Sequence, residues 1–410
     1  MYFQKCATLC KLAMATEPTM TTTIPSIKVS SRIASIDIVR GLIMVIMALD
    51  HVREYFGSTP FRAEDVTQTS VALFGTRWIT HLCAPNFVFL SGISIFLYLQ
   101  KKGSVRDTAI FLLTRGLWLV LVEVVLITFV LQLSYDIILF EVIWVIGWSM
   151  ILFAGLIWLP RKVIAVLAFI ILAGHNLVPQ GATSDVAGVF AGLFLHSPFV
   201  IMNSSGVPVV LVAYTILPWL GVMMAGYCVG AWVLLPADKA FANFWKAGTA
   251  MLALFVVLRL INVYGDPSPW SVQPRGWVYT FLSFINVSKY PPSLLFDLLT
   301  VGIGMLLLAA FTKLRGRVTE WLRVFGQVPF FYFIVHLSFI SLAALIWTSI
   351  SFGRYVNLGF TNPADWPREY EPSLLRVIAV WICVVLVLYF PCRWFANYRK
   401  GHQSRWLSYL

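Results

Sequence analysis

Charged residues are scarce in this sequence, and their scarcity excludes a soluble globular protein. Asp, Glu, Lys and Arg make up 12% of the 410 residues, whereas soluble domains carry about 25%. Hydrophobic residues make up 59%, and the mean hydropathy is +0.82. A chain this apolar folds in a lipid bilayer, so we predict a polytopic membrane protein whose length suits one membrane domain.

Several sequence signals are also missing. The six cysteines show neither a CxxC pair nor the spacing of metal ligands, so we expect no metal site and no disulfide framework. No Walker, Rossmann, GxSxG or HExxH motif is present. Residues 1–34 are polar and lack the apolar core and cleavage site of a secretory signal, so we expect a disordered cytoplasmic tail.

Long apolar runs are what the sequence has instead. About ten of them have the length of roughly 20 residues that a helix needs to cross about 30 Å of hydrocarbon. They lie near residues 36–55, 78–100, 107–131, 142–159, 163–178, 208–235, 247–264, 292–312, 322–349 and 374–392. The expected fold class is all-α, a polytopic bundle of about ten transmembrane helices over residues 35–396, followed by a basic cytoplasmic tail at 397–410.

The Lys and Arg residues gather in alternate loops. Basic clusters follow the second, fourth, sixth and eighth spans and form the C-terminal tail, whereas the other loops hold few basic residues. By the positive-inside rule both chain ends face the cytoplasm. The net charge of +12 therefore reflects membrane topology, and we expect contacts with membrane lipid and none with nucleic acid.

The first span carries polar residues at both ends. Its cytoplasmic end holds Asp37 and Arg40, and its outer end holds Asp50, His51 and Glu54. Arg40 and His51 are three helical turns apart, so they project from nearly the same face with their Cα atoms roughly 16 Å apart. This geometry suits a long anionic donor such as acetyl-CoA, with phosphates at one end and a thioester at the other. We assign Arg40 and Asp37 to donor binding, a role compatible with Asp37 acting as a structural clamp.

Imidazoles at the outer surface are the catalytic candidates. His51 ends the first span and His81 begins the second, so both can converge on one extracytoplasmic pocket. An imidazole, with an ordinary pKa of about 6.5, can take the proton of an attacking amine or hydroxyl, or carry the acyl group itself. Glu54 is the local carboxylate that would orient His51, Asp297 is a distant alternative, and Asp50 is a further acidic candidate.

Polar residues inside the spans have structural interpretations too. His175 and His336 are interpreted as packed side chains. Arg115 and Glu123 are charges within one span and therefore functional candidates by default, although charges on other helices are alternative partners. We assign Arg115 to donor binding.

The loop after the seventh span is the predicted acceptor surface. It combines aromatic and charged side chains with Gly and Pro, and aromatic faces beside a carboxylate suit a sugar. The interfacial belts of Trp and Tyr in membrane proteins are the alternative explanation. The substrate-binding candidates in and beside this loop are Tyr264, Asp266, Trp270, Lys289, Tyr290 and Asp297. Residues 180–207 form either an interfacial helix or a re-entrant lid.

Six unusual stretches are distributed over nearly the whole chain after about residue 32. They are SIDIVRGLIMVIMALDHVREYFG, TRWITHLCAPNFVFLSGISIFLY, NVYGDPSPW, KYPPSLLFDLLTVG, FGQVPFFYFIVHL and YFPCRWFANYRK. These blocks resemble the heparan-α-glucosaminide N-acetyltransferase-like family, chiefly its bacterial branch. An Arg and a His separated by ten residues on a first transmembrane helix also resemble the wider group of membrane acyltransferases that use cytoplasmic acyl donors on extracytoplasmic saccharides.

The resemblance implies an acetyl-CoA-dependent N- or O-acetyltransferase of the bacterial inner (plasma) membrane, with an extracytoplasmic saccharide or glycolipid as acceptor. The family's lysosomal member resembles this chain less closely at its catalytic positions. Its Asn late in the first helix falls on His51, and its loop His has no counterpart here. A transporter or flippase for a small solute or lipid-linked sugar is the alternative function, although no internal repeat supports it. The oligomeric state is open and includes a homodimer.

Overall fold

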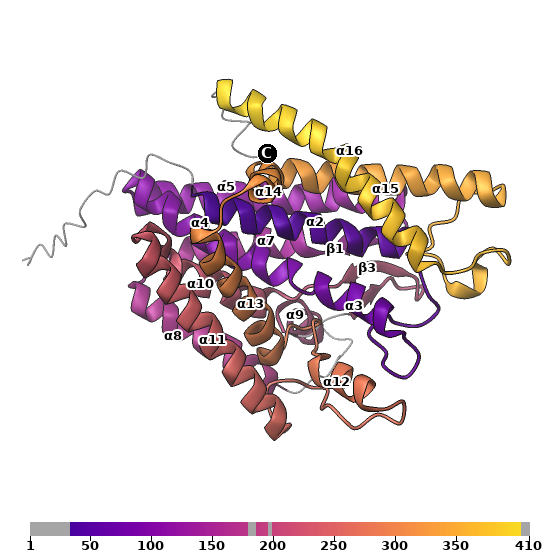
Figure 1. The fold of residues 1–410 in the computed structure, drawn as a ribbon, viewed down its shortest axis with the longest axis horizontal. Coiled ribbons are helices and arrows are strands. Elements are labelled where there is room, and N and C mark those ends of the chain that lie inside the picture. Colours follow the sequence, from indigo (N-terminus) through magenta and orange to yellow (C-terminus); the bar gives the residue numbers. More distant parts are fainter. Residues whose placement is uncertain (1–32, 179–185, 196–198, 403–410) are drawn as a thin grey trace, which may run out of the picture.

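Helices make up most of the fold in the computed structural model of the protein, which describes residues 33–178, 186–195 and 199–402. Figure 1 shows the long helices packed into one bundle, with α3, α12 and the strands gathered towards the right of the view. The α-helices are α2 (Ala34–Phe56), α3 (Val71–Thr80), α4 (Cys83–Lys102), α5 (Val105–Val122), α6 (Thr128–Gln132), α7 (Val142–Leu156), α8 (Arg161–Gly174), α9 (Val186–Phe194), α10 (Ile216–Val229), α11 (Ala237–Ile261), α12 (Trp277–Ile285), α13 (Leu294–Lys313), α14 (Arg317–Gln327), α15 (Pro329–Phe352) and α16 (Leu374–Gly401). A π-helical turn, Glu123–Ile127, joins α5 to α6.

Seven helical segments of the described chain are long and apolar enough to cross a membrane. They are Val71–Lys102, Val105–Gln132, Ile216–Leu234, Ala237–Ile261, Leu294–Lys313, Pro329–Phe352 and Leu374–Gly401. The remaining three expected spans fall on α2, α7 and α8. Of these, α2 has 23 residues but carries five charged side chains, whereas α7 and α8 have only 15 and 14 residues. The chain is therefore a mostly helical, multi-pass membrane protein.

Two boundaries differ from those expected. The helix that contains the predicted span 374–392 continues to Gly401, into the segment 397–410 that is expected to be the basic tail. The predicted span 322–349 is two helices, because α14 ends at Gln327 and α15 begins at Pro329. Most of the predicted N-terminal tail, residues 1–32, lies outside the described residues, as does the last part of the C-terminal one, residues 403–410.

A small three-stranded sheet accompanies the helices. Its strands are β1 (Ile138–Phe140), β2 (Phe199–Met202) and β3 (Pro208–Val212), in the order β1-β3-β2. β3 pairs in parallel with β1 and antiparallel with β2. The β3 residues PVVLV were expected to begin a membrane helix, but their β-branched side chains favour a strand. In the predicted segment 180–207, the described elements are helix α9 and strand β2.

Helix α2 is central, because it contacts α4, α13, α14, α15 and α16. A Cβ atom added at Gly41 would lie 1.9 Å from the carbonyl oxygen of Leu322 on α14, and one added at Gly326 would lie 1.7 Å from the carbonyl oxygen of Asp37. The backbones of α2 and α14 therefore touch directly, as small residues permit between membrane helices. This contact buries the polar beginning of α2.

Candidate active site

The beginning of α2 presents Arg40 to a cavity. Arg40 Nη2 donates a hydrogen bond to Ser94 Oγ on α4 at 3.0 Å. Its Nη1 lies 3.8 Å from Asp37 Oδ1, so the structure brings these two predicted residues together. Asp37 thus has the geometry of a clamp on the Arg40 guanidinium.

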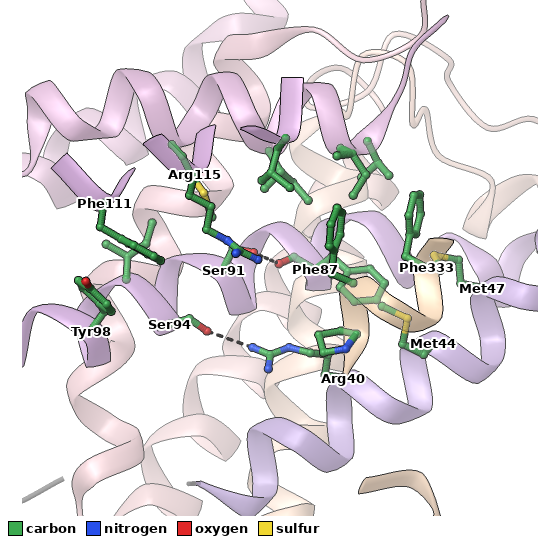
Figure 2. Close-up of a pocket in the computed structure, with 18 of the residues that line it drawn as sticks. Arg40, Met44, Met47, Phe87, Ser91, Ser94, Tyr98, Phe111, Arg115 and Phe333 are labelled. Atoms are coloured by element: carbon green, nitrogen blue, oxygen red, sulfur yellow. Dashed lines mark hydrogen bonds between the residues drawn. The ribbon is translucent and has the colours of Figure 1, made fainter. Parts of the chain in front are cut away.

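The first cavity has a volume of about 290 Å³ and is lined by three arginines, Arg40, Arg115 and Arg399, from α2, α5 and α16. Figure 2 shows the Arg40 and Arg115 side chains extending into the space between α2, α4 and α5. The other lining residues, which are mostly apolar or aromatic, are Met44, Met47, Phe87, Ser91, Ser94, Ile95, Tyr98, Phe111, Leu119, Val142, Ile143, Ile146, Met150, Pro329, Phe330 and Phe333. This cavity can hold an anion with an apolar or aromatic portion.

Arg399 is a cavity residue that the sequence pattern does not predict. Arg399 lies near the end of α16 and its Nη1 donates a hydrogen bond to the carbonyl oxygen of Gln327 at 3.3 Å. It was assigned to a cytoplasmic tail because basic residues after a last span are usually explained by topology alone. The sequence feature that could have pointed to Arg399 is its place inside YFPCRWFANYRK, one of the stretches that carry the family resemblance.

A second cavity, of about 110 Å³, adjoins the first, since Met47, Phe87, Val142 and Phe333 line both. Its polar and ionisable lining residues are Asp50, His51, Glu54, Thr80, Cys83, Glu141, Tyr214, Lys289 and Tyr290. The two cavities together follow α2 from Arg40 to His51.

His51 has a carboxylate and a second imidazole as neighbours. Its Nδ1 lies 3.6 Å from Glu54 Oε2, the i+3 partner that helical spacing predicts. The His336 ring, from α15, lies 5.3 Å from the His51 ring between centroids. His336 is fully buried and its Nδ1 lies 2.9 Å from the carbonyl oxygen of Tyr332, which agrees with a packed histidine. Its position against His51 was not predicted.

Asp50 connects α2 to α3. Its carboxylate accepts hydrogen bonds from Arg77 Nη1 at 3.0 and 3.1 Å, from Thr80 Oγ1 at 2.8 Å, and from Arg53. The guanidinium groups of Arg53 and Arg77 therefore both hold the Asp50 carboxylate. We interpret Asp50 as a cross-link between the helices that carry His51 and His81.

His81 lies on a different cavity from His51. It is buried at the end of α3, with its ring 5.6 Å from the Phe296 ring between centroids. It lines a third cavity of about 820 Å³, which has both acidic and basic walls. Three residues, Glu54, Lys289 and Tyr290, line both the second and the third cavity. The two predicted imidazoles therefore lie on neighbouring spaces with a shared wall.

The outer-loop candidates divide into two groups. Lys289 and Tyr290 line the cavities, whereas the other four predicted residues line none of these three. Asp266 accepts hydrogen bonds from Ser268, Ser288 and Ser293 and lies 3.9 Å from Arg259.

The remaining three outer candidates, Tyr264, Trp270 and Asp297, line none of the three cavities. Trp270 Nε1 donates to the carbonyl oxygen of Arg259 at 2.8 Å. Tyr264 is half-buried. Asp297 is buried on α13, and neither of its carboxylate oxygens has a hydrogen-bond partner among the described residues.

Glu141 is a site residue that sequence reasoning missed. It immediately precedes α7, lines the second cavity with His51, and donates its backbone N–H to Glu123 Oε1 at 2.9 Å. Burial, followed by the nearby Glu54, raises the pKa of Glu141 to about 7. The cavity therefore contains a carboxyl group that can exchange a proton near neutral pH.

The fold and the cavities together define a multi-pass membrane protein with ionisable groups buried along one central helix. Residues 32–260 match the family described as Heparan-alpha-glucosaminide N-acetyltransferase, catalytic. The chain belongs to this family, which implies a membrane acetyltransferase. No curated protein was found to match the chain.

Proposed function

We propose that the protein is an integral membrane acyltransferase. It moves an acetyl group from cytoplasmic acetyl-CoA to an amine or hydroxyl of an extracytoplasmic saccharide or glycolipid. His51 is the general base in this proposal, and the third cavity receives the acceptor.

One observation carries the proposal: the arginine-lined cavity adjoins the cavity that contains His51. Phosphates of coenzyme A suit the arginine end, because guanidinium groups bind phosphate through charge-assisted hydrogen bonds. The Arg40 to His51 spacing along α2, roughly 16 Å, suits the distance between those phosphates and a thioester.

The sidedness of the proposal follows from the basic residues. We propose ten membrane crossings with both chain ends in the cytoplasm, because Lys and Arg gather in alternate loops. The beginning of α2 then faces the cytoplasm, where acetyl-CoA is made available. His51 and the third cavity face the opposite side, where a saccharide acceptor lies.

The chemistry requires removal of one proton. As the amine or hydroxyl attacks the thioester carbon, His51 takes the proton and Glu54 stabilises the resulting imidazolium. An acyl-His51 intermediate is the alternative course, in which the imidazole attacks the thioester first.

Binding of acetyl-CoA tests the proposal before any acceptor is known. Acetyl-CoA at a hundredfold excess over Kd should stabilise the purified protein by roughly 3 kcal/mol, measured as a rise in Tm. Arg399→Gln should weaken this rise, because it removes one of the three cavity arginines. Arg393→Gln is the matched control, since Arg393 lies on the same helix but is exposed and lines no described cavity.

Two outcomes would contradict this assignment. No rise in Tm with acetyl-CoA or with other short acyl-CoA esters would favour the transporter alternative. An equal loss in the two variants would mean that Arg399 contributes only general positive charge.

A further inference from the structure

Lys289 lies where the second and third cavities meet. It is only 7% exposed, yet it lines both spaces. Its ammonium lies 4.9 Å from the centre of the Tyr290 ring and 5.6 Å from that of Tyr214. Within the described parts of the chain, no carboxylate forms an ion pair with it.

A buried charge normally has a partner of opposite sign. The nearby Asp50 carboxylate is already held by Arg53 and Arg77. Burial and the neighbouring Arg77 oppose the charged form of Lys289, but Tyr290 and Asp50 together outweigh them, and the pKa of Lys289 is raised above its ordinary value. The ammonium is therefore a charged donor group facing a space where a ligand can bind.

The loop that carries Lys289 is held in place on both sides. Asp266 accepts hydrogen bonds from Ser288 N at 2.8 Å and from Ser293 Oγ at 2.6 Å. His175 Nε2 lies 2.8 Å from a backbone carbonyl oxygen of the same loop. A charged group on such a fixed loop needs little reorganisation to stabilise a negative charge that forms during a reaction. Asp266 is thus a positioning residue for Lys289.

We propose that the Lys289 ammonium holds the acyl carbonyl oxygen while it carries negative charge. This inference rests on the proposed function. The acceptor nitrogen or oxygen bonds to the thioester carbon, the carbonyl electron pair moves onto oxygen beside Lys289, and the acceptor proton passes to His51. The electron pair then returns, the carbon–sulfur bond breaks, and the coenzyme A thiolate leaves with the proton from His51.

Two unreactive coenzyme A thioethers of similar size test this assignment. S-carboxymethyl-coenzyme A places a carboxylate near the position of the oxyanion, whereas S-acetonyl-coenzyme A carries a neutral ketone there. The purified protein should bind the carboxymethyl compound about tenfold more tightly, as expected for one charge-assisted hydrogen bond. Kd values are measured by isothermal titration calorimetry.

Variants test which residue causes the tighter binding of the carboxymethyl compound. Lys289→Met should abolish it while leaving the Kd of the acetonyl compound within about twofold, because the rest of the donor site is unchanged. Lys289→Arg should retain part of this preference. Asp266→Asn should reduce the preference, because Asp266 holds the loop that carries Lys289. Lys246→Met is the control, since Lys246 is exposed on α11.

The results that would overturn the role of Lys289 differ from the result that would overturn the acyl-CoA donor. Equal binding of the two compounds by the wild-type protein overturns the role of Lys289, and this comparison needs no variant to fold. A preference that persists in Lys289→Met overturns it as well. If the wild-type protein binds neither compound, the proposed acyl-CoA donor is wrong and the inference falls with it.

Discussion

The two adjoining cavities along α2 differ in the charges that they contain. In the first, Arg40, Arg115 and Arg399 come from three helices and share a mostly apolar wall. In the second, acidic and basic groups such as Glu141 and Lys289 face one smaller space. Cations alone suit binding of an anion, whereas neighbouring acids and bases suit proton transfer. In the proposed function, this difference separates donor binding from chemistry along a single helix.

The largest expected effect is on the rate of acetyl transfer, and it comes from a substitution in the second cavity, which contains His51. His51→Ala should lower acetyl transfer by about 10²- to 10⁴-fold, because it removes the proposed general base. Acetyl-CoA should still raise the Tm of this variant, since the arginine cavity is unchanged. Transfer is followed as release of free coenzyme A thiol with amino-sugar and sugar acceptors.

Two further histidines sharpen this test. His81→Ala should have a milder effect, because His81 lines only the third cavity. His402→Ala, at the exposed end of the last helix, should leave the rate unchanged. Loss of both binding and transfer in His51→Ala would contradict the separation of the two cavities.

The packing of α2 gives the next largest effect. Gly41→Ala should lower the free energy of unfolding by about 3 kcal/mol, because the new Cβ would overlap the α14 backbone. Gly75→Ala is the matched control, since a Cβ there meets nothing within 4 Å and alanine favours a helix. Thermal unfolding of both variants in one detergent provides the measurement. A Gly41→Ala variant as stable as Gly75→Ala would mean that the two helices separate easily and that the first cavity is not rigid.

The smallest effect concerns Glu141 and pH. Its folded-state pKa of about 7 lies above the ordinary value of 4.5, so the folded protein retains a proton that the unfolded chain has lost between these pH values. Stability should therefore fall as the pH rises through this window, by at most about 3 kcal/mol. Glu141→Gln should remove the penalty, raising the Tm at pH 8 and much less at pH 5.

A matched acid controls the pH experiment. Glu369→Gln, in an exposed loop, should shift the Tm little at either pH. An equal gain in stability for Glu141→Gln at both pH values would show that the gain is unrelated to the proton on Glu141.

Local spacing explains which features could be predicted from the sequence. The pairs Asp37–Arg40 and His51–Glu54 were predictable because residues three apart on a helix share a face. Seven of the ten expected spans overlap described helical segments that are long and apolar enough to cross a membrane, because apolar length is a local property. Strand β3 was missed because a short apolar run fits either structure, and pairing with β1 and β2 decided it.

The sequence by itself determined the membrane setting, the helices and the polar residues at the two ends of α2. Only the tertiary structure decided that Arg399 joins Arg40, that Glu141 and His336 lie beside His51, and that Asp266 supports the Lys289 loop. The physical reason is the range of the forces involved. Helical geometry relates neighbours through 3.6 residues per turn, whereas contacts between distant segments depend on how the whole bundle packs.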